Sequence, residues 1–298
     1  MAQDVPNGRA WWVLLKQSFR AWNDDYAPSM GAALAYYTLF SLAPLLIIVI
    51  AVGGLVVGQE AARGEIVAQF GALVGTEGAR AVQDLLASAS RPQASVVASI
   101  VGVVTLVVGA TSVFAELQSS LDRIWRAPAL PQAGVFALIR TRLSSFGMIV
   151  ALGFLLLVSL VIGAALSALG QWSGWLFSTL LLLQAANLIV GFAITVVLFA
   201  AAYRILPRVA IAWGDVWIGA VVTAILFTVG KYLIGLYLGH AGVASGFGAA
   251  GSVVVILVWV YYSAQVFLLG AEFTWVFAHR HGSRVSIPPD KPALNSAA

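Results

Sequence analysis

The chain has 298 residues, of which 61% are hydrophobic and only 9% carry a charge. A soluble domain carries about 25% charged residues, so this composition excludes a water-soluble protein and predicts an all-α, polytopic membrane protein. The absence of cysteine excludes disulfides, thiolate metal sites and cysteine nucleophiles. In such a chain the net charge of +4 indicates the topology of the loops rather than nucleic-acid binding.

Residues 1–28 predict a cytoplasmic N-terminal helix that lies in the membrane interface. One helical face gathers large apolar side chains, and the opposite face gathers basic ones, which prevents the helix from spanning. The apolar face comprises Trp11, Trp12, Leu15, Phe19 and Trp22. The alternative is an amphipathic helix that packs on the rest of the protein.

Six apolar stretches are each long enough to cross a hydrocarbon core, which takes about 20 residues. They cover approximately residues 30–57, 95–114, 144–169, 175–202, 216–238 and 250–277. We therefore expect one membrane domain over residues 1–298, with a six-span bundle at 30–277 and a disordered cytoplasmic tail at 278–298. His279 and His281 fall on that tail and are expected to be solvated.

Residues 58–94 form the longest polar segment between two spans. Within it, apolar residues recur at helical spacing in two groups. Gly75 and Gly78 separate the groups. This pattern predicts an extracytoplasmic pair of amphipathic helices joined by a glycine turn.

Polar side chains inside the spans mark a candidate pathway for a solute or ion. Tyr37, Ser41 and Pro44 share one face of the first span, where proline frees the carbonyl of residue 40 and favours a kink. Gln184 and Asn187 lie three apart in the fourth span. The alternative for both groups is hydrogen bonding between helices, which polar residues commonly provide in membrane bundles.

Lys231 lies deep in the fifth span, about 10 Å below its outer end at 1.5 Å per residue. A charge inside a membrane is costly, so such a lysine is a candidate site for an anion or a lipid headgroup. The alternative is a snorkelling lysine, or one capped by carbonyls of the glycine-rich segment at 239–251.

Four further charged residues are expected to be structural anchors at the cytoplasmic end of the bundle. Glu272 ends the sixth span, and Glu116 ends the second. Arg204 and Arg208 follow the fourth span, and we expect an ion pair between Glu272 and a nearby arginine. A pair between Glu272 and Lys231 is not expected, because the two lie on opposite sides of the midplane.

The basic residues set the orientation. Twelve of the 16 lysines and arginines fall on the side that carries both termini, against three on the other side. Basic residues collect on cytoplasmic loops, so both termini are predicted to be cytoplasmic.

Catalytic signatures are missing from the sequence. No histidine has a carboxylate at metal-binding spacing, and no phosphate-binding or dinucleotide fingerprint occurs. We expect no catalytic residue, no metal site, no cofactor and no enzymatic activity.

Four segments carry a resemblance to a known family over about residues 15–280. They are AALAYYTLFSLAPLL (32–46), LQSSLDRIW (117–125), RILPRVAIAWGDVWIGAVVTAILFTVGKY (204–232) and SGFGAAGSVVVILVWVYYSAQVFLLGAEF (245–273). With these segments the chain resembles the YihY/BrkB family of six-span proteins of the bacterial inner membrane, and the last two segments are specific in their order and spacing. One departure is Asp122, where relatives often have asparagine.

The resemblance implies location and architecture. The family's old label as a ribonuclease is not carried over, because RNA hydrolysis needs an acid, a base or metals on a phosphate-binding surface. We expect instead a transporter or flippase-like protein for a lipid-like or anionic small solute. The alternative is a non-transporting scaffold or envelope-maintenance factor. The expected partners are the bilayer and an anionic lipid or small solute, with a homo-oligomer left open and no nucleic acid.

Overall fold

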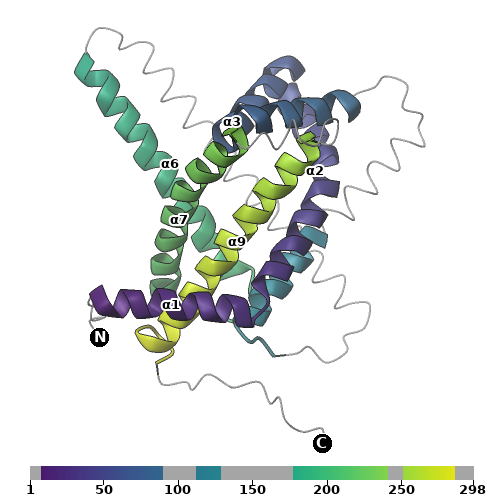
Figure 1. Ribbon diagram of the computed structural model, residues 1–298. Coiled ribbons are helices and arrows are strands. Elements are labelled where there is room, and N and C mark those ends of the chain that lie inside the picture. The colour runs from purple at the N-terminus through teal and green to yellow at the C-terminus, as the bar shows by residue number, and fades with distance from the viewer. Residues whose placement is uncertain (1–7, 90–111, 129–176, 241–250, 286–298) are drawn as a thin grey trace, which may run out of the picture.

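The computed structural model describes residues 8–89, 112–128, 177–240 and 251–285, and all regular structure in these ranges is helical. The all-α prediction is therefore confirmed for this part of the chain (Figure 1). The helices are α1 (Gly8–Asp24), α2 (Ala27–Val57), α3 (Gln59–Ala89), a helical segment over residues 112–124, α6 (Phe177–Ile205), α7 (Trp213–His240) and α9 (Gly251–Arg280).

Three of these helices contain stretches long and apolar enough to cross a membrane. The stretches are Leu188–Ile205, Trp213–Tyr237 and Val253–Arg280, and they coincide with the last three predicted spans. The first predicted span falls on α2, which contains no charged residue. Most of the predicted span at 95–114 and all of that at 144–169 lie outside the described residues, so the count of six stays a prediction.

Helix α9 is the centre of the bundle. It packs against α7, α2, α1 and α3, while α6 packs against α7 (Figure 1). From Ala264 to Ala278 most of its side chains are buried, on every side of the helix. A helix that is apolar all round is a buried helix, and this explains why α9 occupies the middle.

Glycines allow α7 and α9 to approach closely. A Cβ atom at Gly219 would lie 2.8 Å from the Cβ of Thr274, and one at Gly270 would lie 2.8 Å from the Cβ of Thr223. Each threonine hydroxyl donates to a carbonyl of its own helix at 2.7 Å, to Gly219 from Thr223 and to Gly270 from Thr274. Small residues at such contacts are typical of membrane helix packing.

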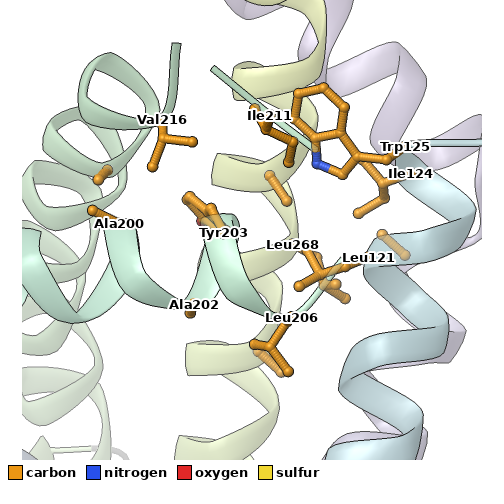
Figure 2. Close-up of a cluster of buried hydrophobic side chains, with 14 of the residues drawn as sticks. Leu121, Ile124, Trp125, Ala200, Ala202, Tyr203, Leu206, Ile211, Val216 and Leu268 are labelled. Atoms are coloured by element: carbon orange, nitrogen blue, oxygen red, sulfur yellow. The ribbon is translucent and has the colours of Figure 1, made fainter. Parts of the chain in front are cut away.

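A buried tyrosine connects α6 to this pair of helices. Tyr203 is fully buried, and its hydroxyl donates to the Phe267 carbonyl at 2.7 Å and lies 3.0 Å from the Thr223 hydroxyl. Figure 2 shows the surrounding cluster, in which side chains of the 112–128 segment (the 112–124 helix and the four residues after it) and of the residues after α6 meet those of α9. They include Leu121, Ile124, Trp125, Leu206, Ile211 and Leu268.

Helix α3 turns back on itself. The helix is continuous from Gln59 to Ala89, where the sequence predicts two helices with a glycine turn. However, a Cβ atom at Gly71 would lie only 3.5 Å from the Cβ of Ala79. Eight residues of straight helix rise about 12 Å, so the helix is bent sharply between these positions. Its two ends then pack together on α2 and α9.

Helix α1 lies across the C-terminal end of α9 (Figure 1). Leu14 is fully buried against Phe273, Val276 and Phe277. In contrast, Trp12 and Phe19 are 71% and 58% exposed. One side of the helix thus packs on the protein, as the alternative expected, while its position in a membrane interface stays a prediction.

The C-terminal tail begins later than the sequence predicts. Helix α9 continues to Arg280, and Ala278 is fully buried. The His279 ring lies on the Trp275 ring, with its Nδ1 atom 2.9 Å from the Trp275 carbonyl oxygen, so His279 is not simply solvated. Residues 281–285 follow as a turn in which His281 is half-buried and Ser283 and Val285 are exposed, and residues 286–298 lie outside the described part of the chain.

Candidate functional site

Charged residues gather where α1 meets α2, where the 112–124 segment ends, where α6 meets α7 and where α9 ends. We call this region the basic end. At its centre the carboxyl groups of Asp25 and Glu272 lie within hydrogen-bond reach of each other. Glu272 is fully buried, and neither of its carboxylate oxygens has a hydrogen-bond partner. Neither oxygen is hydrogen-bonded to an arginine, so the expected ion pair is not seen as a direct contact, and the group that faces Glu272 is another acid.

Asp25 occupies the turn between α1 and α2 and is half-buried. Burial raises the pKa of its carboxyl above the ordinary value, while the neighbouring Glu272 carboxyl and the charges of Arg126 and Arg123 oppose this rise. The neighbouring charge of Asp24 raises the same pKa. Asp25 could not be singled out from the sequence, because nothing in its local pattern separates it from the other polar residues of the α1 end.

Two residues in the left-handed backbone region flank the carboxyl pair. Tyr26 has φ 60° and Arg126 has φ 50°, and they are the positive-φ residues other than glycine in the described ranges. Arg126 takes the position after the 112–124 segment that glycine usually fills, with its N–H bonded to Arg123 and that of Ala127 bonded to Asp122. Such strained residues cluster at functional sites.

Cation–π contacts hold the arginines in place. The Arg123 guanidinium lies 5.2 Å from the centroid of the Tyr26 ring. The Arg126 guanidinium lies 4.7 Å from that of the Trp275 ring. Each contact links the 112–128 segment to a different neighbour, the α1–α2 turn in one case and α9 in the other.

An arginine pocket opens beside the carboxyl pair. Its volume is about 260 Å³, and its lining includes Arg123, Arg126 and Arg208 with a single acid, Asp122. Asp122 accepts from the Arg208 side chain at 3.1 Å and from the Arg208 backbone N–H at 2.8 Å. Burial raises the pKa of Asp122, against the effect of these bonds. The pocket therefore keeps an excess of positive charge.

The other predicted anchors are distributed around the basic end. Arg204 donates to the Ile211 carbonyl and lies over the Trp213 ring, so it joins the ends of α6 and α7. Arg208 forms the ion pair with Asp122. Glu116 is half-buried on the 112–124 segment.

Of the predicted pathway residues, Tyr37 and Ser41 have described side chains, and neither lines the arginine pocket. Ser41 is buried and donates to the Thr38 carbonyl at 3.1 Å. The Tyr37 ring makes an edge contact with the Tyr36 ring. The α2 helix continues unbroken past Pro44. The side chains of Pro44, Gln184 and Asn187 lie outside the described residues.

Lys231 lies in the opposite half of the bundle. Its side chain is half-buried, and its amine is 5.3 Å from the centroid of the Tyr232 ring. No carboxylate in the described ranges pairs with it. The glycine-rich segment that would cap it, residues 241–250, lies outside those ranges, so both alternatives for Lys231 stay predictions.

The fold and the spans define a helical integral membrane protein with a charged cluster at one end of its bundle. The chain belongs to the family described as Virulence factor BrkB, which it matches over residues 18–295. This confirms the family resemblance found in the sequence.

Among its relatives is a UPF0761 membrane protein of Pseudoalteromonas atlantica, 30% identical over 250 residues, which cover 82% of this chain and 78% of the relative. One of Neisseria meningitidis serogroup B is 26% identical over 92% of this chain and 64% of its own length. One of Tolumonas auensis is 28% identical over 58% of this chain and 56% of its own length. The chain thus spans less than two thirds of two of these relatives. No solved structure matches it.

Proposed function

We propose that the protein is a six-span protein of the bacterial inner membrane, with both termini cytoplasmic, that transports a lipid-like or anionic small solute. The excess of lysine and arginine at the basic end supports the orientation, because such residues collect on the cytoplasmic side. The observation that carries the transport proposal is the arginine pocket at that end.

The pocket suits the anionic group of such a solute. Guanidinium groups bind phosphate and carboxylate in two-pronged fashion. A volume of about 260 Å³ accommodates a headgroup rather than a whole lipid. Basic pockets between helices on the cytoplasmic side are a recurring way to bind anionic headgroups. Asp122 neutralises only part of the charge that Arg123, Arg126 and Arg208 supply.

Reconstituted vesicles test the proposal. The full chain in liposomes should accelerate movement of a fluorescent anionic phospholipid between leaflets more than that of a phosphatidylcholine analogue. Arg123→Gln should slow the anionic lipid about tenfold, the loss expected for one charge-assisted contact. Arg20→Gln is the matched control, because Arg20 is exposed on α1 and does not line the pocket. Equal rates with and without protein, or equal loss in both variants, would exclude transport through this pocket.

Lys231→Met tests the opposite half of the pathway. If the lysine contacts the solute, transport should fall while the melting temperature stays unchanged. Normal transport with a lower melting temperature would make the lysine structural.

The second candidate function is a non-transporting scaffold for other envelope components. The bent helix α3 favours it, because α3 lies at the end of the bundle opposite α1 (Figure 1) and offers a folded surface outside the three spans. A scaffold would show no lipid movement, and a cross-linker placed on the exposed Gln83 should capture a partner protein from intact cells. In neither function does the chain act as an enzyme, and purified protein free of soluble nucleases should leave RNA intact.

A further inference from the structure

Glu272 and Asp215 are two fully buried acids with opposite surroundings. Asp215 accepts from the Ser283 hydroxyl at 2.6 Å and from the Ser283 N–H at 3.2 Å and 3.3 Å. Its charged form is thus supplied with donors. Glu272 has none: both oxygens are buried and without a partner, although Asp25 lies within hydrogen-bond reach.

Two ionised carboxylates cannot form a hydrogen bond with each other, because neither has a proton to donate. Burying an ionised carboxylate that has no hydrogen-bond donors is strongly unfavourable, so such a group takes up a proton instead. One proton on either carboxyl turns the contact into a hydrogen bond and leaves a single negative charge on the pair. Paired acids in enzymes behave in this way when they are brought close together.

Charged groups from the neighbouring elements surround the carboxyl pair of Asp25 and Glu272. The α1 end supplies Asp24, and the 112–128 segment supplies Arg126 and Arg123. Helix α2 has no charged residue. The two charges of α7 are elsewhere, since Asp215 is bound to Ser283 and Lys231 lies in the opposite half.

We propose that Asp25 and Glu272 together form a binding site for one proton. The proton comes from water, and the protonated carboxyl donates its O–H to the carboxylate of the other residue. The remaining charge of −1 is balanced by Arg126, which its left-handed backbone and its contact with Trp275 hold beside the pair. Because Asp25 belongs to the α1–α2 turn and Glu272 to α9, the bound proton fixes α1 to the centre of the bundle.

This inference does not depend on transport, and its test measures the proton directly. Infrared difference spectra of the full chain in nanodiscs, wild type minus Glu272→Gln, should show the carbonyl band of a protonated carboxyl near neutral pH. Exchange into D₂O should shift this band. Glutamine copies the shape of the protonated acid and can donate to Asp25, so Glu272→Gln should fold.

A second variant shows whether the proton is shared. In Asp25→Asn the like charge is gone and the amide can donate to Glu272, so the band should disappear at a pH at least about one unit lower than in wild type. This comparison uses wild type and Asp25→Asn alone, so it decides the question even if Glu272→Gln does not fold.

Asp215→Asn is the matched control, since Asp215 is equally buried but fully bonded, and it should leave the band unchanged. Three results would overturn the proposal: no difference band in Glu272→Gln, loss of the band in Asp215→Asn, or the same pH midpoint in wild type and Asp25→Asn. A band that emerges only after sodium and potassium are removed would assign the site to a metal cation and would overturn it as well.

Discussion

The two halves of α7 differ in what surrounds them. In the half that begins at Trp213, Val216, Ala220, Thr223 and Ala224 are completely buried against the rest of the bundle. In the other half the large side chains Val229, Tyr232, Leu233, Leu236 and Tyr237 are all more than half exposed. The same helix is therefore a core element near the basic end and a surface element around Lys231.

This difference shows where the described bundle is held together. Near the basic end, glycine contacts, the Tyr203 hydroxyl and several cation–π contacts join α6, α7, α9 and the 112–128 segment. Around Lys231 the last close approach is at Gly230, where a Cβ atom would lie 2.6 Å from Cζ of Tyr262. We expect substitutions to cost stability in the first half and to leave it nearly unchanged in the second.

Gly270→Val should have the largest effect. The added side chain would collide with Thr223 and Tyr203 at the contact between α7 and α9. Overpacking of this kind costs about 3 kcal/mol at the upper end of its usual range, measured as a loss of unfolding free energy in nanodiscs. Gly191→Val is the control, because a Cβ atom at Gly191 meets nothing within 4 Å. Equal losses of unfolding free energy in Gly270→Val and Gly191→Val would show that the close contact between α7 and α9 does not determine stability.

Tyr203→Phe should follow. It removes the hydroxyl that donates to the Phe267 carbonyl and leaves that acceptor without this bond. The expected loss of unfolding free energy is about 1–2 kcal/mol. Tyr232→Phe, in the exposed half, should stay within about 0.5 kcal/mol of wild type. If Tyr232→Phe proves the more damaging change, the assignment of the two halves is wrong.

Asp122→Ala should cost about 1 kcal/mol, since the Arg208 side chain is partly exposed and its ion pair is screened. Asp122→Asn should cost less, because the amide oxygen can still accept from the Arg208 N–H. Thermal melting at low and high salt separates the ion pair from the backbone hydrogen bond, because salt screens only the ion pair. The difference in melting temperature between the two variants should therefore persist at high salt. Identical melting of the alanine and asparagine variants would show that the backbone bond adds nothing.

Lys231→Met should have the smallest effect on stability, within about 0.5 kcal/mol of wild type. The side chain is half-buried in the exposed half, and its described contact is with the neighbouring Tyr232 ring. Unfolding in the same nanodiscs provides the measurement. A large loss would mean that the lysine holds part of the bundle, and the exposed half would then be less independent than proposed.

Length and hydropathy were sufficient to predict the last three spans, because a helix that crosses a membrane needs a long apolar stretch wherever its neighbours lie. They were also sufficient to place Glu272 near one end of its span. Neither length nor hydropathy indicates which neighbouring residues the Glu272 carboxyl faces. Its neighbour Asp25 comes from a turn at the other end of the sequence, so the facing acid could not be predicted from the pattern around Glu272.

The backbone conformation at the basic end could not be predicted from the sequence either. Glycine is the usual signal for the left-handed position after a helix, and Arg126 gives no such signal. A close helix contact, in contrast, does have a signal in the sequence: Gly219, Thr223, Gly270 and Thr274 are small residues at helical spacing on two neighbouring spans. In α3, Gly75 and Gly78 correctly indicated a change of direction, although the helix bends there without an assigned break.

The paired glycine and threonine contacts also fix the register between α7 and α9. The helices are antiparallel, so a slip of one turn in one direction would bring Thr274 against Thr223 and Phe227 against Gly270. A slip in the other direction would place the two glycines together and leave both threonines without a recess. Sliding by a turn is therefore blocked in one direction and unfavourable in the other. Any large rearrangement of this protein should move α7 and α9 as a single body, with α1, α6 or the 112–128 segment changing position around them.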